Sequence, residues 1–102
     1  MHPNAKEGEN AVVQILINKG FEILKRNFYW CKHEIDIIAQ RNDIVYLFEV
    51  KYISNISMLR MRPKQIEAYD QFMQINYANQ IVKVYFAIVN NKHVQFIPME
   101  LT

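Results

Sequence analysis

Two acidic residues, Asp36 and Glu49, lie within adjacent runs of largely apolar residues, 34–39 and 46–51. The segment between the runs has the composition of a turn, so the sequence predicts an antiparallel hairpin. Such a hairpin brings the two carboxylates to a Cβ separation of about 5 Å, where they repel each other. Apolar surroundings strengthen this repulsion by lowering the local dielectric constant. A fold that keeps such a pair neutralises it with a proton or a cation.

The turn determines which residues face one another. With Asn42 and Asp43 at its two central positions, the register pairs the two carboxylates and also places Glu34 opposite Lys51. Because side chains alternate along a strand, all four residues are expected on one face of the sheet. Mg²⁺ or Mn²⁺ is the most economical neutralising group, since it joins both carboxylates and leaves positions for water and phosphate. Lys51 points the same way as Glu49 and can reach a metal-bound water or a phosphate oxygen.

The alternative is an exposed strand face, on which Glu34 and Lys51 form an ordinary cross-strand ion pair. A third carboxylate favours the metal site. Residues 5–19 have the periodicity of an amphipathic helix, and Glu9 lies on its apolar side. An inward-facing Glu is uncommon unless it is paired or liganded, so Glu9 is a candidate for the same site. Otherwise Glu9 only complements the dipole of the helix N-terminus.

A second helix is predicted from Pro63 to about Tyr77. Lys64 and Gln65 fall in its first turn, where they either project towards the hairpin or lie on plain surface. The charged residues from position 51 to position 64 are all basic, namely Lys51, Arg60, Arg62 and Lys64. A positive strip beside an acidic cluster fits a polyanionic substrate.

The order of these residues resembles the PD-(D/E)XK nuclease superfamily in its Holliday-junction-resolvase-like branch, and most closely the YraN-like family of predicted endonucleases. The resemblance covers roughly residues 7–75 and rests on Gly8-Glu9, Ala11, Gly20-Phe21, Leu24, Arg26-Asn27, Glu34-Ile35-Asp36-Ile37-Ile38-Ala39, Phe48-Glu49-Val50-Lys51 and Gln65. Two positions depart from the family pattern. His33 stands where a Gly usually precedes Glu-Ile-Asp, and Ile53 stands where a basic residue commonly follows the Lys. The second departure bears on how far the family's phosphate contacts carry over.

The resemblance implies a restriction-endonuclease-like α/β/α sandwich in the order αβββαβ, with a mixed central sheet. The rest of the sequence agrees with that order, because strands are predicted over 21–28, 81–89 and 93–97. The strand over 81–89 is apolar on both sides, as expected of an interior strand that helices cover.

The resemblance also implies the chemistry, which is hydrolysis of a phosphodiester with Mg²⁺ or Mn²⁺. Asp36 and Glu49 would hold the cation with the carbonyl oxygen of Val50, and Glu9 would bind through a water or hold a second cation. Lys51 would orient or deprotonate the attacking water and offset charge on the phosphoryl oxygens. The catalytic set is completed by Gln65, which would orient water or substrate through hydrogen bonds.

The expected partner is DNA with branched or single-stranded regions. Its predicted contacts are Lys25, Arg26, Lys32, Arg60, Arg62 and Lys64. The aromatic run 28–30 either stacks on unpaired bases or belongs to the core. The apolar loop 53–59 suggests a dimer contact or a wedge into a branched duplex, and by analogy with junction resolvases a homodimer is expected. Two alternatives remain open: a non-catalytic module of nuclease fold that binds structured DNA, and a single-strand or flap nuclease of the same chemistry.

Length, composition and net charge limit the classes of protein to which the chain can belong. The chain of 102 residues, 51% of them hydrophobic, is expected to form one domain over residues 1–102. No stretch approaches the roughly 20 apolar residues that span a bilayer, and residues 1–4 lack a signal-peptide pattern, so a cytoplasmic location is expected. A single cysteine, Cys31, excludes an intramolecular disulfide and a Cys-rich zinc site. The net charge of +2 is too small for a global basic field, so nucleic-acid binding would depend on local patches.

Overall fold

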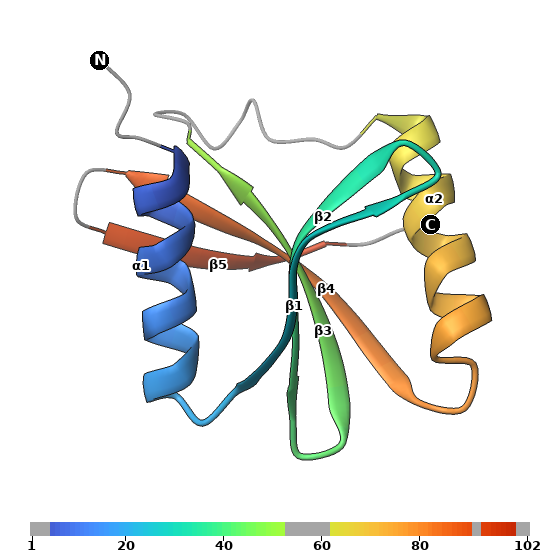
Figure 1. Cartoon of the computed structure of the whole chain (residues 1–102), viewed down its shortest axis with the longest axis horizontal. Helices are drawn as coiled ribbons and strands as arrows, with labels where there is room; N and C mark the ends of the chain where they lie inside the picture. Colours follow the sequence, from blue (N-terminus) through green and yellow to red (C-terminus); the bar gives the residue numbers. More distant parts are fainter. Residues whose placement is uncertain (1–4, 53–61, 91–92, 100–102) are drawn as a thin grey trace.

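The computed structural model describes residues 5–52, 62–90 and 93–99. Its elements, in chain order, are α1 (Ala5–Asn18), β1 (Glu22–Trp30), β2 (His33–Arg41), β3 (Ile44–Lys51), α2 (Pro63–Asn76), β4 (Ile81–Asn90) and β5 (His93–Pro98) (Figure 1). This is the predicted αβββαβ order, followed by the predicted last strand. Neither helix in the described ranges has the length and apolar character needed to cross a bilayer.

The described strands form one five-stranded mixed sheet in the order β1-β2-β3-β4-β5. Strands β3 and β4 are parallel, because α2 carries the chain from the end of one to the start of the other, whereas the other neighbours are antiparallel. Helix α1 lies on one face of the sheet and α2 on the other (Figure 1). The predicted α/β/α sandwich is therefore confirmed.

The turn between β2 and β3 confirms the predicted hairpin. Asn42 and Asp43 have positive φ angles of 54° and 64°, the conformation that a tight two-residue hairpin turn requires. From this turn the strands pair in the predicted register as far as Ile37 and Phe48. A short local signal therefore determined which residues of the two strands lie side by side.

Each face of the sheet has its own apolar core. Val12 and Leu16 of α1 pack on the first face, and Tyr69 and Phe72 of α2 pack on the second. All four are at most 2% exposed. Among the described residues, the buried charged side chains are Asp36 and Glu49, at 7% and 8% exposure. Charged groups are rarely buried without a partner, so these two mark the place where the fold departs from simple packing.

Candidate active site

Strands β2 and β3 separate at Asp36. The backbone pairing that starts at the turn ends at Ile37 and Phe48, so the predicted direct pairing of Asp36 with Glu49 does not form. Oδ2 of Asp36 instead accepts a hydrogen bond of 2.7 Å from the backbone N–H of Val50. A side chain thus supplies the acceptor where the backbone of β2 no longer does. The expectation of one shared face was wrong for Glu34. Glu34 is joined through Asn27 to Glu9 on α1, whereas Glu49 accepts a hydrogen bond from Tyr69 on α2.

Glu49 is held from two directions. Its Oε2 accepts a 2.7 Å hydrogen bond from the hydroxyl group of Tyr69, and its Oε1 lies 3.5 Å from Nζ of Lys51. Burial, with the charge of Glu49, raises the pKa of Tyr69, while a hydrogen bond from Gln65 acts in the opposite direction. Tyr69 therefore remains a proton donor to Glu49. The side chain of Lys51 is 32% exposed, so its ammonium group is accessible to a ligand from solvent.

The environment of Asp36 favours a proton on its carboxyl group. Burial is the largest of several causes that together raise the pKa of Asp36 from 3.8 to about 8, and the charge of Glu49 and a hydrogen bond with Glu34 are the next. The N–H of Val50 acts in the opposite direction. At neutral pH the protein without a cation therefore retains a proton at Asp36. A bound cation would release that proton, because a metal ligand must be ionised.

Glu9 is connected to this pair through an asparagine. Nδ2 of Asn27 donates to Oε1 of Glu9 at 2.8 Å and to Oε2 of Glu34 at 3.3 Å, and Glu34 in turn hydrogen bonds with Asp36. Asn27 has a φ of 51°, a conformation that Asn tolerates better than most residues. Within residues 5–52, 62–90 and 93–99, no three His, Cys, Asp or Glu side chains are arranged to hold a metal ion. Glu9 thus belongs to the surrounding hydrogen-bond network.

Asn27→Asp tests this network. The change keeps the size of the side chain and its tolerance of positive φ, but it places a carboxylate between those of Glu9 and Glu34 and removes the donor. We expect a loss of about 1–2 kcal/mol in the free energy of unfolding at pH 7, measured with urea. Asn42→Asp makes the same change at another positive-φ position, in an exposed turn, and is expected to cost less than about 0.5 kcal/mol. Equal costs would show that Asn27 does not link the two carboxylates.

Tyr52, the residue that follows β3, contacts the first turns of α1 beside the site. Burial, followed by the charge of Glu9, raises the pKa of Tyr52, and backbone N–H groups of Glu9 and Gly8 hydrogen bond to its hydroxyl. The Tyr52 side chain occupies the space where a side chain at position 8 would begin. Gly8 is therefore required for close packing, which explains a glycine within a helix.

Gly8→Ala is expected to destabilise the protein by about 1–3 kcal/mol, because the new methyl group overlaps the ring of Tyr52. In a Tyr52→Ala background the same change should instead stabilise by about 0.5–1 kcal/mol, since Ala favours a helix more than Gly. Thermal unfolding of the four proteins measures both effects. A destabilisation of the same size in both backgrounds would contradict the contact.

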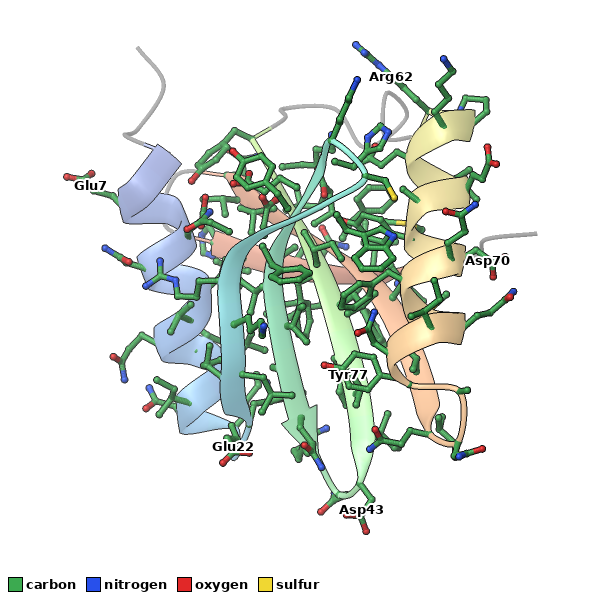
Figure 2. The ribbon with its side chains drawn as sticks, turned by 45° about the vertical axis from the view of Figure 1, so that its right-hand side comes forward. Glu7, Glu22, Asp43, Arg62, Asp70 and Tyr77 are labelled. Atoms are coloured by element: carbon green, nitrogen blue, oxygen red, sulfur yellow. The ribbon has the colours of Figure 1, made fainter. Side chains whose placement is uncertain are left out.

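The predicted DNA-binding residues fall into two groups. Lys32, in the turn between β1 and β2, is exposed, as are Arg62 and Lys64 at the N-terminal end of α2. This turn lies beside that end of the helix, near the labelled Arg62 (Figure 2). Lys64 lines a small hollow with His33. The structure therefore brings the hairpin tip and the helix end together. Arg60 lies outside the described residues, as does the loop 53–59.

Lys25 and Arg26 lie elsewhere, along β1. Nζ of Lys25 is 4.5 Å from the ring centroid of Phe28, and Nη2 of Arg26 donates to Oδ1 of Asn10 on α1 at 2.7 Å. In the aromatic run 28–30, the first and last rings pack on Phe72 in the core, with centroids 5.5 Å and 5.4 Å away. The ring between them, of a tyrosine, is 69% exposed.

The sequence analysis did not single out Tyr69 as a functional residue. Tyr69 is fully buried, yet its hydroxyl group donates a hydrogen bond to Glu49. The available signal was its spacing from Gln65, because residues four apart lie on the same face of a helix. No comparable signal existed for Asn27, whose role depends on three elements that are distant in sequence.

The sandwich, with its buried carboxylates at the point where β2 and β3 part, defines the class of the fold as restriction-endonuclease-like. The chain belongs to Uncharacterised protein family UPF0102, whose sequence profile matches residues 8–91. This is the YraN-like family that the motifs indicated.

Relatives in the family include a UPF0102 protein of Campylobacter fetus, 38% identical over 71 residues, and one of Flavobacterium psychrophilum, 47% identical over 51 residues. These matches cover 70% and 50% of this chain. They span 63% and 43% of the relatives' own lengths, so the chain covers less than two thirds of each.

Two solved structures share the fold. An XisH family protein from Nostoc punctiforme aligns with a TM-score of 0.57 at 14% identity, covering 88% of this chain and 98% of its own. A fdxN element excision controlling factor protein from Anabaena variabilis aligns with a TM-score of 0.59 at 12% identity, covering 90% and 98%. At such low identity, these likenesses establish the fold alone.

Proposed function

We propose that this protein is a metal-dependent nuclease of the PD-(D/E)XK superfamily that hydrolyses phosphodiester bonds in branched or structured DNA. The observation that carries the proposal is the buried pair Asp36 and Glu49, with the ammonium group of Lys51 beside it. Two like charges in a buried position are costly unless something neutralises them. The restriction-endonuclease-like class of the fold supports the same conclusion.

The oxygen atoms of the pair fit a hard divalent cation. Oδ2 of Asp36 accepts from Val50 and Oε2 of Glu49 accepts from Tyr69. Oε1 of Glu49 faces the ammonium group of Lys51, which is exposed enough to turn away and admit a cation. Mg²⁺ and Mn²⁺ prefer such carboxylate oxygens. The carbonyl oxygen of Val50, and Glu9 through a water, would supply further ligands. When bound, the cation would polarise a phosphodiester oxygen and lower the pKa of a coordinated water.

The remaining residues of the site would position the reactants. Lys51 is close enough to Glu49 to neutralise it and exposed enough to turn towards a phosphate oxygen, where it would offset developing charge. Tyr69 would keep Glu49 in one orientation, because its hydroxyl group donates to only one of the two carboxylate oxygens. Gln65 would act on Glu49 through Tyr69 and would also reach water or substrate from the first turn of α2.

The basic side chains at the same end of the molecule would hold the DNA backbone. Lys32, Arg62 and Lys64 are exposed and belong to the hairpin tip and helix end that meet there. Such contacts position a duplex without reading its sequence, which suits recognition of DNA shape. A homodimer would present two sites to a junction with two-fold symmetry.

Cleavage of labelled DNA tests the proposal. Four-way junction, flap, nicked duplex, duplex and single-stranded DNA are each incubated with Mn²⁺, Mg²⁺ or EDTA. We expect cutting of the junction or flap with Mn²⁺ or Mg²⁺ and none with EDTA. Binding of these DNAs without any cutting would contradict the nuclease and identify a non-catalytic binding module.

A further inference from the structure

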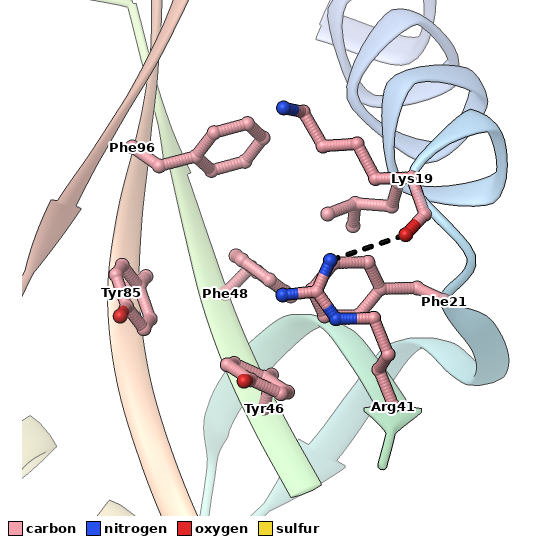
Figure 3. A pocket seen from close by; sticks show the side chains of 8 residues that line it. Lys19, Phe21, Arg41, Tyr46, Phe48, Tyr85 and Phe96 are labelled. Atoms are coloured by element: carbon pink, nitrogen blue, oxygen red, sulfur yellow. Dashed lines mark hydrogen bonds between the residues drawn. The ribbon is translucent and has the colours of Figure 1, made fainter. Parts of the chain in front are cut away.

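The face of the sheet that carries α1 is wider than one helix covers. Beyond the C-terminal end of α1, a hollow of about 520 Å³, including the part open to solvent, lies between the helix and β3, β4 and β5 (Figure 3). It is separate from the candidate active site. Arg41 in its wall is the last residue of β2 and lies five residues from Asp36, so about 16 Å of strand separates them at about 3.3 Å per residue.

Aromatic rings form the wall of this hollow. The rings of Tyr46 and Phe48 are nearly parallel, with an interplanar angle of 12°, and Phe96 meets Phe48 edge to face at 5.6 Å. Phe21 closes the side nearest α1, 4.9 Å from Tyr46. The hydroxyl groups of Tyr46 and Tyr85 have no hydrogen-bond partner among the described residues. Tyr46 and Phe48 are themselves buried, so the accessible apolar surface of the wall comes from the half-buried rings of Phe21, Tyr85 and Phe96.

Two cations lie at the same hollow. The guanidinium group of Arg41 lies over the Phe21 ring, with Cζ 4.2 Å from the centroid, and Lys19 extends towards Phe96 on the far side (Figure 3). No carboxylate in the described part of the chain forms an ion pair with either residue. Two positive charges therefore face the hollow without a negative partner.

Capping of α1 explains only part of this arrangement. Nη1 of Arg41 donates to the carbonyl oxygen of Lys19 at 3.1 Å, which satisfies a group at the end of the helix. That bond uses one of the five donors of the guanidinium group, and Nε remains buried without a partner. The cap accounts neither for the ammonium group of Lys19 nor for the aromatic wall.

We propose that this hollow is a nucleotide-binding site, in which the base lies against the aromatic wall and the phosphate lies between Lys19 and Arg41. Bases stack on aromatic side chains irrespective of sequence, and the planar guanidinium group matches phosphate geometry. The nucleotide is either free or an unpaired nucleotide of a bound strand, and the second source rests on the proposed function.

Binding measured by NMR in EDTA tests this site. The probes are thymidine 5′-monophosphate, thymidine, inorganic phosphate and a thymidine oligonucleotide, and the signals followed belong to Arg41, Tyr46, Tyr85 and Phe96. We expect the monophosphate to bind at least about tenfold more tightly than thymidine or phosphate alone, because only it uses both the wall and the cations. If only the oligonucleotide shifts these signals, the site takes a strand nucleotide.

Two variants separate the phosphate from the base. Lys19→Gln, at an exposed position, should weaken monophosphate binding about three- to tenfold and leave thymidine binding unchanged. Phe96→Leu should weaken both, because the Phe96 ring forms part of the aromatic wall. Absence of shifts at the hollow with every probe, or binding that neither pocket variant alters, would overturn the proposal. The NMR measurement is made in EDTA, where no cleavage occurs, so it tests nucleotide binding independently of nuclease activity. A negative cleavage assay would therefore not contradict the nucleotide site, and absence of nucleotide binding would not contradict the nuclease.

Discussion

Glu49→Gln is expected to reduce metal-dependent cleavage at least about 10³-fold while DNA binding changes less than about threefold. Glu49 would be a direct ligand of the catalytic cation, and an amide binds a hard cation far less well than a carboxylate does. The amide oxygen can still accept the hydrogen bond from Tyr69, so the local structure should persist. Single-turnover cleavage and gel-shift measurements on the same junction DNA separate catalysis from binding.

Glu22→Gln is the matched control for this change. Glu22 is exposed at the start of β1, away from the site, so its substitution removes one negative charge without touching the carboxylate pair. We expect cleavage within about twofold of the wild-type protein. Loss of activity in both variants, or in neither, would contradict the role assigned to Glu49.

Asp36→Asn is expected to stabilise the protein in the absence of metal. The amide resembles the protonated carboxyl group in shape and charge, so it keeps an acceptor for Val50 without the electrostatic cost of ionisation beside Glu49. We expect a gain of about 1–3 kcal/mol in the free energy of unfolding at pH 7.5, which corresponds to roughly 5–20 °C in melting temperature for a domain of this size. Thermal unfolding in EDTA measures it.

The raised pKa of Asp36 also predicts how the stability difference between Asp36→Asn and the wild-type protein changes with pH. Between the ordinary pKa of 3.8 and the folded-state pKa of about 8, folded Asp36 holds a proton that the unfolded chain has released. The contribution of the Asp36 proton to the free energy of unfolding is fully present below about pH 4, and it is lost as the pH rises to about 8. The slope is at most about 1.4 kcal/mol per pH unit. The advantage of Asp36→Asn over the wild-type protein should therefore grow as the pH rises through this interval.

Mn²⁺ should make the wild-type protein more stable than Asp36→Asn. At millimolar concentration it should raise the melting temperature of the wild-type protein by mass action, and it should raise that of Asp36→Asn less. Asp43→Asn, an exposed turn position that also has positive φ, makes the same chemical change away from the site and should behave as wild type. Parallel pH profiles and equal metal responses in Asp36→Asn and wild type would contradict a shared site.

The elements and the hairpin register were predictable because their causes are local. Asn42 and Asp43 provide the turn, and Pro63 marks the start of α2. Alternation of apolar residues then determines which faces of the strands are buried. The two buried carboxylates were likewise predictable, since they interrupt apolar runs at positions that the turn relates to each other.

The geometry around the carboxylates was not predictable, because its causes are distant in sequence. The separation of β2 from β3 depends on a side chain, Asp36, that replaces a backbone acceptor. Gly8 adjoins Tyr52, and Asn27 joins a helix to a strand, only after the whole sandwich has assembled. No periodicity or spacing encodes such contacts.

The aromatic hollow illustrates a further limit. Tyr46, Phe48 and Tyr85 stand in strands whose pattern indicates an interior sheet covered by helices. The sequence does not reveal that a single helix leaves part of that face open. Side chains that pattern alone assigns to the core therefore line a hollow in the folded protein.

The most direct test of the central claim is anomalous diffraction from crystals grown with Mn²⁺. The account predicts a manganese peak at the carboxylate pair, where Asp36 and Glu49 would hold the cation, with Nζ of Lys51 displaced from Glu49. The same crystals of Glu49→Gln should lack the peak. Manganese bound elsewhere, or a vacant carboxylate pair at millimolar Mn²⁺ with Asp36 ionised, would contradict a metal-dependent active site at this position.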